Sequence, residues 1–184
     1  MRGSQEATVA IRWQKLSKPF QIKYIRHILY LEYAINQSLM KYTCTVEIDL
    51  PIDKVAELWA DEQYFHKWQD GFQSIDHFKG VPNSIGAKSR IIIEQGKRKM
   101  ELIETIISNK LPEEKKALYE HIHMTNTQTT RFEEVTTNQT LYISEVEYTQ
   151  FNGFMPKLMA KLFPGMFKKQ SQKWMNQFKE FAIN

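Results

Sequence analysis

The chain has 184 residues, of which 42% are apolar and 25% are charged, as expected for one soluble globular domain with a substantial core. Its single cysteine excludes an internal disulfide, and no apolar run approaches the roughly 18 residues that a membrane span needs. Lys and Arg interrupt every candidate apolar core of a signal peptide near the N-terminus, so we expect a cytoplasmic protein.

The net charge of +4 is unevenly distributed. Residues 1–39 carry six Lys and Arg against two Asp and Glu, and residues 155–184 carry six Lys against one Glu. The remaining residues, 40–154, are therefore acidic overall. A chain that is basic only at its two ends does not support nucleic-acid binding, and we expect no such partner.

Residues 1–39 have no clear strand alternation and end in apolar residues at helical spacing. They are either an added amphipathic helix, which packs on the domain, binds a partner or lies on a membrane surface, or the product of a misassigned start codon before Met40. We therefore divide the chain into an N-terminal extension, 1–39, and a domain, 40–184.

From Tyr42 to Leu50 apolar and polar residues alternate without error, which predicts a half-buried strand. Pro51 ends this strand, and Asp53 is positioned as the N-cap of a short helix. Asp61 can cap a second short helix. The large apolar residues of the two helices include Trp59, Phe65 and Trp68.

Five or six further strands are predicted, separated by turn residues such as Gly80, Pro82, Gly86 and Gly96. Short connections join neighbouring antiparallel strands, so these strands form a meander. They lie near Phe72–Lys79, Ala87–Gln95, Lys99–Asn109, Lys115–Met124, Thr127–Thr136 and Gln139–Phe151.

The last part of the chain is helical, and Pro164-Gly165 divides it into a short lead-in helix and a long amphipathic one. Burying its large apolar side chains is worth roughly 1.5–3 kcal/mol each. Because everything from Tyr42 to Phe151 is strands and short helices, the obvious cover is a sheet wrapped around the long helix. The apolar stripe consists of Phe167, Trp174, Phe178 and Phe181, with the small Ser171 between them.

This α+β order of strand, two short helices, meander and long helix resembles the START-like helix-grip superfamily, in particular the bacterial SRPBCC or polyketide cyclase/dehydrase-like proteins. The similarity covers about residues 40–182. It implies a hydrophobic cavity between sheet and helix, in a superfamily that binds lipids, sterols, hormones, quinones and polyketides and includes some cyclases, hydrolases and chaperone activators. The residues that carry it are Leu50-Pro51-Ile52-Asp53-Lys54-Val55, Asp61, Trp68, Gly80, Ile85-Gly86, Glu104, Leu111-Pro112, Phe132 and Phe178-Lys179.

Twelve residues are expected to line such a cavity. Tyr142 and Tyr148 share one face of the last strand, where their phenols can bond a carbonyl or hydroxyl of a ligand or simply pack in the core. The full set is Trp59, Phe65, Trp68, Leu102, Phe132, Tyr142, Tyr148, Phe163, Phe167, Ser171, Trp174 and Phe178.

Glu104 is the main candidate for acid–base chemistry, because it shares a strand face with apolar residues such as Leu102. Desolvation there would raise the pKa of its carboxyl group. A partner such as Arg90 or Arg131 would instead hold the carboxylate ionised in a structural or anion-orienting role.

His121 and His123 flank Ile122 on a predicted strand, so both side chains would point to the same face. With a third ligand such as His66 or His77 they could hold a metal. In the alternative that we favour, this face is solvent or the cavity mouth, while Leu118, Ile122 and Met124 point inward. We therefore expect no metal and no cofactor.

The sequence contains no phosphate-binding loop, metalloprotease motif, cysteine pair or nucleophile elbow. We expect a protein that binds a small hydrophobic ligand, such as a lipid, quinone or polyketide, more than an enzyme. The alternatives are a cyclase or dehydrase that uses Glu104, His121 or Tyr148, and a protein-interaction module with a filled core. The lysine-rich outer face of the last helix is expected to be solvated or to contact an anionic membrane or an acidic partner.

Overall fold

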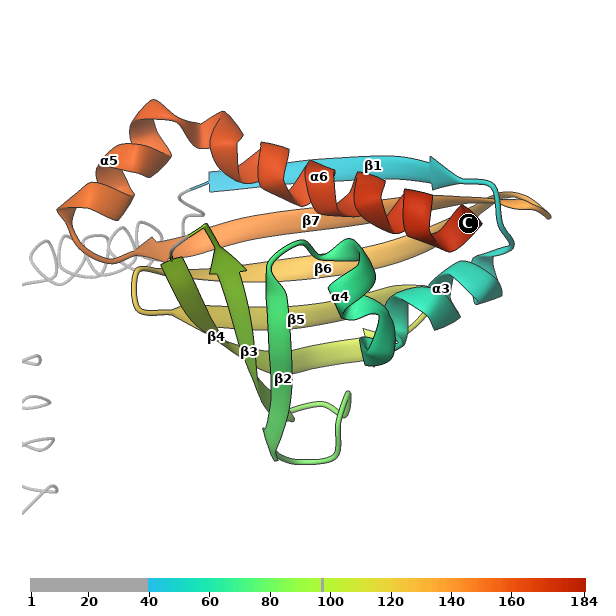
Figure 1. Cartoon of the computed structure of the whole chain (residues 1–184), viewed down its shortest axis with the longest axis horizontal. Helices are drawn as coiled ribbons and strands as arrows, with labels where there is room; N and C mark the ends of the chain where they lie inside the picture. Colours follow the sequence, from blue (N-terminus) through green and yellow to red (C-terminus); the bar gives the residue numbers. More distant parts are fainter. Residues whose placement is uncertain (1–39, 97) are drawn as a thin grey trace, which may run out of the picture. The chain divides into compact units, whose positions relative to one another are not determined.

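The computed structural model describes residues 40–96 and 98–184, so the expectations for residues 1–39 lie outside the described residues. Strand β1 (Met40–Ile48) leads into helix α3 (Ile52–Ala60), the 3-10 turn η1 (Glu62–Tyr64) and helix α4 (Phe65–Trp68) (Figure 1). Six strands and two helices follow: β2 (Phe72–Lys79), β3 (Lys88–Gln95), β4 (Arg98–Lys110), β5 (Glu114–His121), β6 (Met124–Thr136), β7 (Gln139–Phe151), α5 (Phe154–Leu162) and α6 (Pro164–Ile183).

The seven strands form one antiparallel sheet in the order β1-β7-β6-β5-β4-β3-β2. Strands β2 to β7 are a meander, and β1 pairs with β7 at one edge. The sheet curves, and α6 lies along its concave side, where α3 and α4 cover the other end of the same face (Figure 1). The predicted α+β helix-grip architecture is thus confirmed.

The first and last strands show the alternating burial of side chains that their sequences predict. Cys44 and Ile48 on β1 are buried, as are Tyr142, Ser144 and Val146 on β7. Cys44 lies directly opposite Ser144 in the register, and its thiol donates to the Lys168 carbonyl of α6 over 3.6 Å. The inward faces of β1 and β7 therefore form the surface on which α6 packs.

The side chain of Phe178 on α6 is completely buried. Its ring meets those of Trp68 at 5.2 Å and Tyr142 at 5.8 Å, measured between centroids. Met175 is almost as enclosed, although the predicted aromatic stripe did not include it. The centre of the stripe is thus rotated slightly toward Met175.

Two local predictions are wrong. Pro51 is the N-cap of α3, and Asp53 lies in its first turn without capping the helix. Strand β5 ends at His121 and β6 begins at Met124, so Ile122 and His123 form the turn that was expected near residue 126. Ile122 is 75% exposed and does not point inward. No Gly, Pro, Asn or Asp marks this turn, so the sequence carried no turn signal there. Asp61, by contrast, accepts a hydrogen bond from the Gln63 backbone N–H over 2.9 Å, as a cap should.

Candidate functional site

A cavity of about 460 Å³ lies between the concave face of the sheet and α6, with α3 and α4 at one end. Its wall is mainly apolar, with a limited number of polar groups. Nine of the twelve residues expected to line it do so: Trp59, Phe65, Trp68, Leu102, Tyr142, Tyr148, Phe167, Ser171 and Trp174.

Three expected residues do not reach the cavity. Phe132 and Phe178 are packed one layer deeper, where Phe132 meets the Trp59 ring edge-on at 5.8 Å. Phe163 lies at the break between α5 and α6 and is 54% exposed. Sequence periodicity gives the face on which a residue lies, but not its depth in the core.

Apart from Leu102, the expected set omitted the aliphatic part of the wall that β2, β3 and β4 contribute. Ile91 and Ile93 line the cavity and are buried, whereas Ile92 between them is more exposed. Because all three are isoleucine, the sequence has no alternation that could have identified the inward pair. The aliphatic residues concerned are Ile75, Ile91, Ile93 and Met100.

A row of polar residues crosses the sheet on the cavity side. Each member lies directly opposite the next in the strand register, from β2 to β7. Directly opposite residues on neighbouring strands share a face, so this row places hydrogen-bonding groups side by side. Its members are His77, Ser89, Glu104, Tyr119, Asn126 and Tyr148, of which the last four line the cavity.

Glu104 is 7% exposed, and its carboxylate accepts a hydrogen bond from the Tyr119 hydroxyl over 2.8 Å. The expected arginine partners are wrong. Arg90 pairs with Glu101 at 2.9 Å, and Arg131 pairs with Glu145 at 3.2 Å. Burial first, and then the nearby Glu104 charge, raise the pKa of Tyr119 well above its ordinary value. Tyr119 therefore remains a donor to this carboxylate.

Replacing Tyr119 by phenylalanine is expected to lower the free energy of unfolding by about 1–3 kcal/mol, because a buried carboxylate loses its hydrogen-bond donor. Urea unfolding of wild type and Y119F measures the change. In a Glu104→Gln background the same substitution should lower the free energy of unfolding by less, because the side chain at position 104 then carries no charge. Equal costs in both backgrounds would show that the hydroxyl does not support the Glu104 charge.

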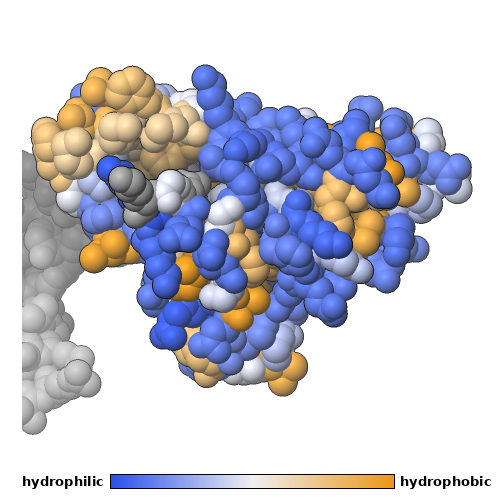
Figure 2. All heavy atoms as spheres, viewed as in Figure 1, coloured by the Kyte–Doolittle hydropathy of each residue, from blue (hydrophilic) through white to orange (hydrophobic). Residues whose placement is uncertain are grey.

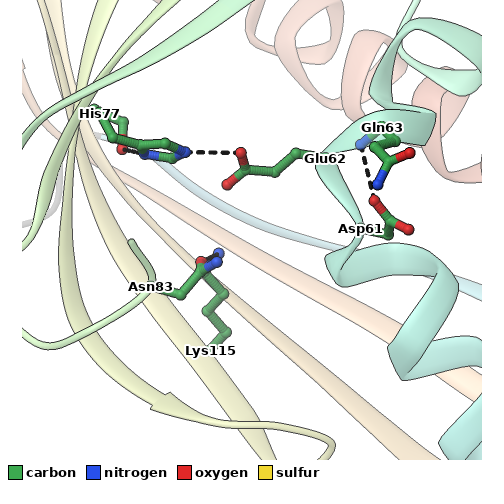
Figure 3. A network of polar contacts seen from close by, with 7 residues as sticks. Asp61, Glu62, Gln63, His77, Asn83 and Lys115 are labelled. Carbon is green, nitrogen blue, oxygen red and sulfur yellow. Dashed lines mark hydrogen bonds and ion pairs between the residues drawn. The ribbon is translucent and has the colours of Figure 1, made fainter. Parts of the chain in front are cut away.

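A second polar group lies where α3 approaches the sheet. The Lys115 ammonium donates to Asn83 Oδ1 over 2.7 Å (Figure 3). It also lies 5.5 Å from the centre of the Trp59 ring. The Trp59 indole N–H in turn donates to the Tyr142 hydroxyl over 2.9 Å. These contacts hold Lys115, Trp59 and Tyr142, three residues of the cavity wall, in place.

His77 connects the short helical segment to the sheet. Its Nδ1 is 2.8 Å from Ser89 Oγ, and its Nε2 is 2.8 Å from a carboxylate oxygen of Glu62 on η1. Figure 3 shows Glu62 reaching from η1 toward the histidine on β2. Because Glu62 also lines the cavity, this bridge holds the segment that closes one end of it.

His121 does not belong to the cavity. It lines a separate surface pocket with Ile122 and Asn152, and its ring lies 5.3 Å from that of His123 in the adjoining turn. Burial and the neighbouring His123 lower the pKa of His121. An acid–base role for His121 in the main cavity is therefore contradicted. Within residues 40–96 and 98–184, no three His, Cys, Asp or Glu side chains are grouped so that they could hold a metal ion.

Four phenols contribute to the cavity wall: Tyr42, Tyr119, Tyr142 and Tyr148. Burial is the main cause that raises the pKa of each hydroxyl above its ordinary value. The Tyr42 hydroxyl also shares a hydrogen bond with Ser171 Oγ of α6 over 2.9 Å.

Stability is expected to fall as the pH rises above about 10, where the phenols of an unfolded chain ionise. Between that pH and the raised folded-state pKa values the unfolded state binds fewer protons, so each such phenol costs about 1.4 kcal/mol per pH unit. Phenolate absorbance at 295 nm and circular dichroism, followed together during alkaline titration, test this. The four phenols should ionise only as the dichroism is lost, and full ionisation of a folded chain would contradict the expectation.

Within the described residues, no helix has both the length and the apolar character to cross a membrane.

No family model and no curated protein matches the sequence. Solved structures do match, each with about a tenth of its residues identical. The protein TTHA0849 from Thermus thermophilus is 13% identical, with a TM-score of 0.64 over 78% of this chain and 97% of that one. The aromatase/cyclase Zhui from Streptomyces sp. R1128 is 10% identical, with a TM-score of 0.65 over 77% and 92%. A START superfamily protein from Mycobacterium smegmatis is 13% identical, with a TM-score of 0.62 over 76% and 97%. The described domain therefore has the START-like helix-grip fold that its sequence resembles.

Proposed function

We propose that this protein binds a small hydrophobic ligand in the cavity between the sheet and α6. The observation that carries the proposal is the cavity itself: about 460 Å³ with a mainly aromatic and aliphatic wall. Ligand sites typically have 300–1,000 Å³, an apolar lining and a few polar groups that fix orientation. A core filled by side chains, as the interaction-module alternative requires, would leave no such space.

The polar groups of the wall favour a ligand with oxygen atoms, such as a quinone or polyketide, over a plain hydrocarbon chain. Glu104, Tyr119, Asn126 and Tyr148 offer hydrogen-bonding groups along one line of the wall. Trp68 also lines the cavity, and its buried indole N–H has no hydrogen-bond partner among the described residues. Such a donor is costly to leave unpaired, so an acceptor oxygen of a ligand would stabilise it.

Titration with N-phenyl-1-naphthylamine, a neutral probe that fluoresces in apolar sites, tests the proposal. We expect saturable binding of one probe per chain. Native mass spectrometry of protein purified from its own host should then reveal a bound mass that is lost on denaturation. If the probe does not bind and the native mass is that of the bare chain, the proposal fails.

A second candidate is an enzyme of the cyclase or dehydrase type. It is favoured by one contact, the Tyr119–Glu104 hydrogen bond of 2.8 Å in the cavity wall, which pairs an acid with a potential base. Tyr148 lines the same cavity, whereas His121 does not. The solved structure of an aromatase/cyclase with this fold makes the candidate worth testing.

Cyclisation with dehydration removes water from the ligand, so the mass of the bound compound would change. Incubating the ligand identified by mass spectrometry with wild type and with Glu104→Gln separates the two candidates. A loss of water with wild type alone supports the enzyme. An unchanged ligand with both proteins leaves the binding function.

A further inference from the structure

The segment from α5 to the last turns of α6 has an unusual surface. It contains no Asp or Glu from Gly153 to Lys179, but six lysines. Five large apolar side chains in its first half are about half exposed or more: Phe154, Met155, Leu162, Phe163 and Met166. None of the residues of α5 is buried. Figure 2 shows these apolar side chains gathered over α5 at one end of the described domain.

Lysines flank this apolar group. Lys157 and Lys161 are exposed on α5, and Lys168 and Lys169 are exposed on the following turns of α6. We refer to these four lysines and the five apolar residues as the α5–α6 surface. Large apolar side chains surrounded by basic residues are typical of helices that lie in the interface of an anionic bilayer, with the lysine stems extending toward the lipid headgroups.

The α5–α6 surface adjoins the cavity. Met166 is 49% exposed and also lines the cavity, and its neighbour Phe167 lines it as well. One side of the α6 N-terminal turn thus faces solvent while the other faces the proposed ligand. Phe167 packs on the Tyr148 ring at 5.2 Å and on the Phe151 ring at 5.8 Å, so this turn of α6 forms part of the cavity wall over β7.

We propose that the α5–α6 surface docks on an anionic lipid bilayer, where it exchanges an apolar ligand between the bilayer and the cavity. The docking follows from the surface alone, and only the exchange rests on the proposed function. An anionic bilayer fits better than a protein partner because the positive charge is spread along both helices without an acidic residue to set a register. A partner protein, a second copy of the chain and residues 1–39 are the competing occupants.

Sedimentation of the full chain with vesicles tests the docking. We expect the chain to bind vesicles made of an equimolar mixture of phosphatidylglycerol and phosphatidylcholine. Its binding to vesicles of phosphatidylcholine alone should be at least tenfold weaker, and a rising salt concentration should release it from the mixed vesicles. Absence of binding to the anionic vesicles would overturn the proposal.

Two variants locate the contact. Lys157→Glu with Lys161→Glu removes positive charge, and Phe154→Ser with Leu162→Ser removes apolar surface; each pair should weaken vesicle binding at least tenfold. The matched controls lie elsewhere on the domain: Lys79→Glu with Lys99→Glu, and Val81→Ser with Ile85→Ser, all at exposed positions. These should bind as wild type does. If the α5 variants also bind as wild type does, the contact lies elsewhere, for example in residues 1–39, and the proposal is wrong.

The probe titration keeps the two proposals separate. The α5 variants should bind N-phenyl-1-naphthylamine in solution as wild type does, because neither pair alters a residue of the cavity wall. Vesicle binding without probe binding would refute the ligand function and leave the docking. Probe binding without vesicle binding would refute the docking and leave the ligand function.

Discussion

Replacing Phe178 by alanine should lower the free energy of unfolding by about 3–5 kcal/mol, the range for removal of a buried aromatic ring. The ring is completely buried and contacts those of Trp68, Tyr142 and Phe181. It thus joins α6 to α4 and to the sheet. Urea unfolding at a temperature near maximum stability measures the loss.

Phe154→Ala is the matched control, since it removes the same ring from a position that is 76% exposed. Its effect should stay within about 0.5 kcal/mol. The urea dependence of the unfolding free energy should be unchanged in both variants if they still unfold in one step. A loss below about 1 kcal/mol for Phe178→Ala would mean that α6 is not packed on the sheet as described.

Filling the cavity is expected to abolish ligand binding. Val146 is almost completely buried on β7 and lines the cavity, so Val146→Trp places a large ring in the space that the ligand would occupy. Binding of N-phenyl-1-naphthylamine should weaken at least tenfold, which corresponds to about 1.4 kcal/mol. Because an empty cavity can accept part of the ring, the cost in stability should remain about 1–3 kcal/mol.

Val135→Trp is the control for this experiment. It makes the same change on β6 at a position that is 48% exposed and outside the cavity wall. Probe binding should be retained. If both variants bind the probe equally well, the probe lies outside the cavity, and the proposed site is wrong even if the protein binds apolar compounds.

Docking at the α5–α6 surface and binding in the cavity would make a coherent mechanism. An apolar ligand that is poorly soluble in water would enter beside Met166 and Phe167, which already lie between the surface and the cavity. The row of Glu104, Tyr119, Asn126 and Tyr148, which begins beside Phe167 at Tyr148 and continues across the sheet, would then hold its polar atoms. In this proposal the buried Glu104 carboxylate would provide selectivity, because a ligand without a matching donor would bury it further without a new hydrogen bond.

The sequence by itself was sufficient for the element order and for the inward faces of the first and last strands. Alternation at residues 42–50 and at 141–148 is a local property with period two, and burial of Cys44, Tyr142 and Val146 follows from it. The helical period likewise predicted that Phe167, Ser171 and Trp174 would face the sheet, although it missed Met175. Local periodicity and element order therefore predicted the fold class and nine residues of the cavity wall, but not the remaining two thirds of that wall.

Only the tertiary structure decided which polar groups meet. The partner of Glu104 is Tyr119 because β4 and β5 pair in a register that places them directly opposite, and sequence reasoning had offered Arg90 and Arg131. That register is set by the β4–β5 turn at residues 111–113 and by an irregularity in the pairing between Ile106 and Ser108, which the sequence pattern does not show. Depth in the core is equally non-local: Phe178 and Trp174 share a helix, yet Phe178 is enclosed by α4 and the sheet while Trp174 lines the cavity. A periodic pattern specifies direction from the backbone, whereas register and depth depend on what the other elements place opposite.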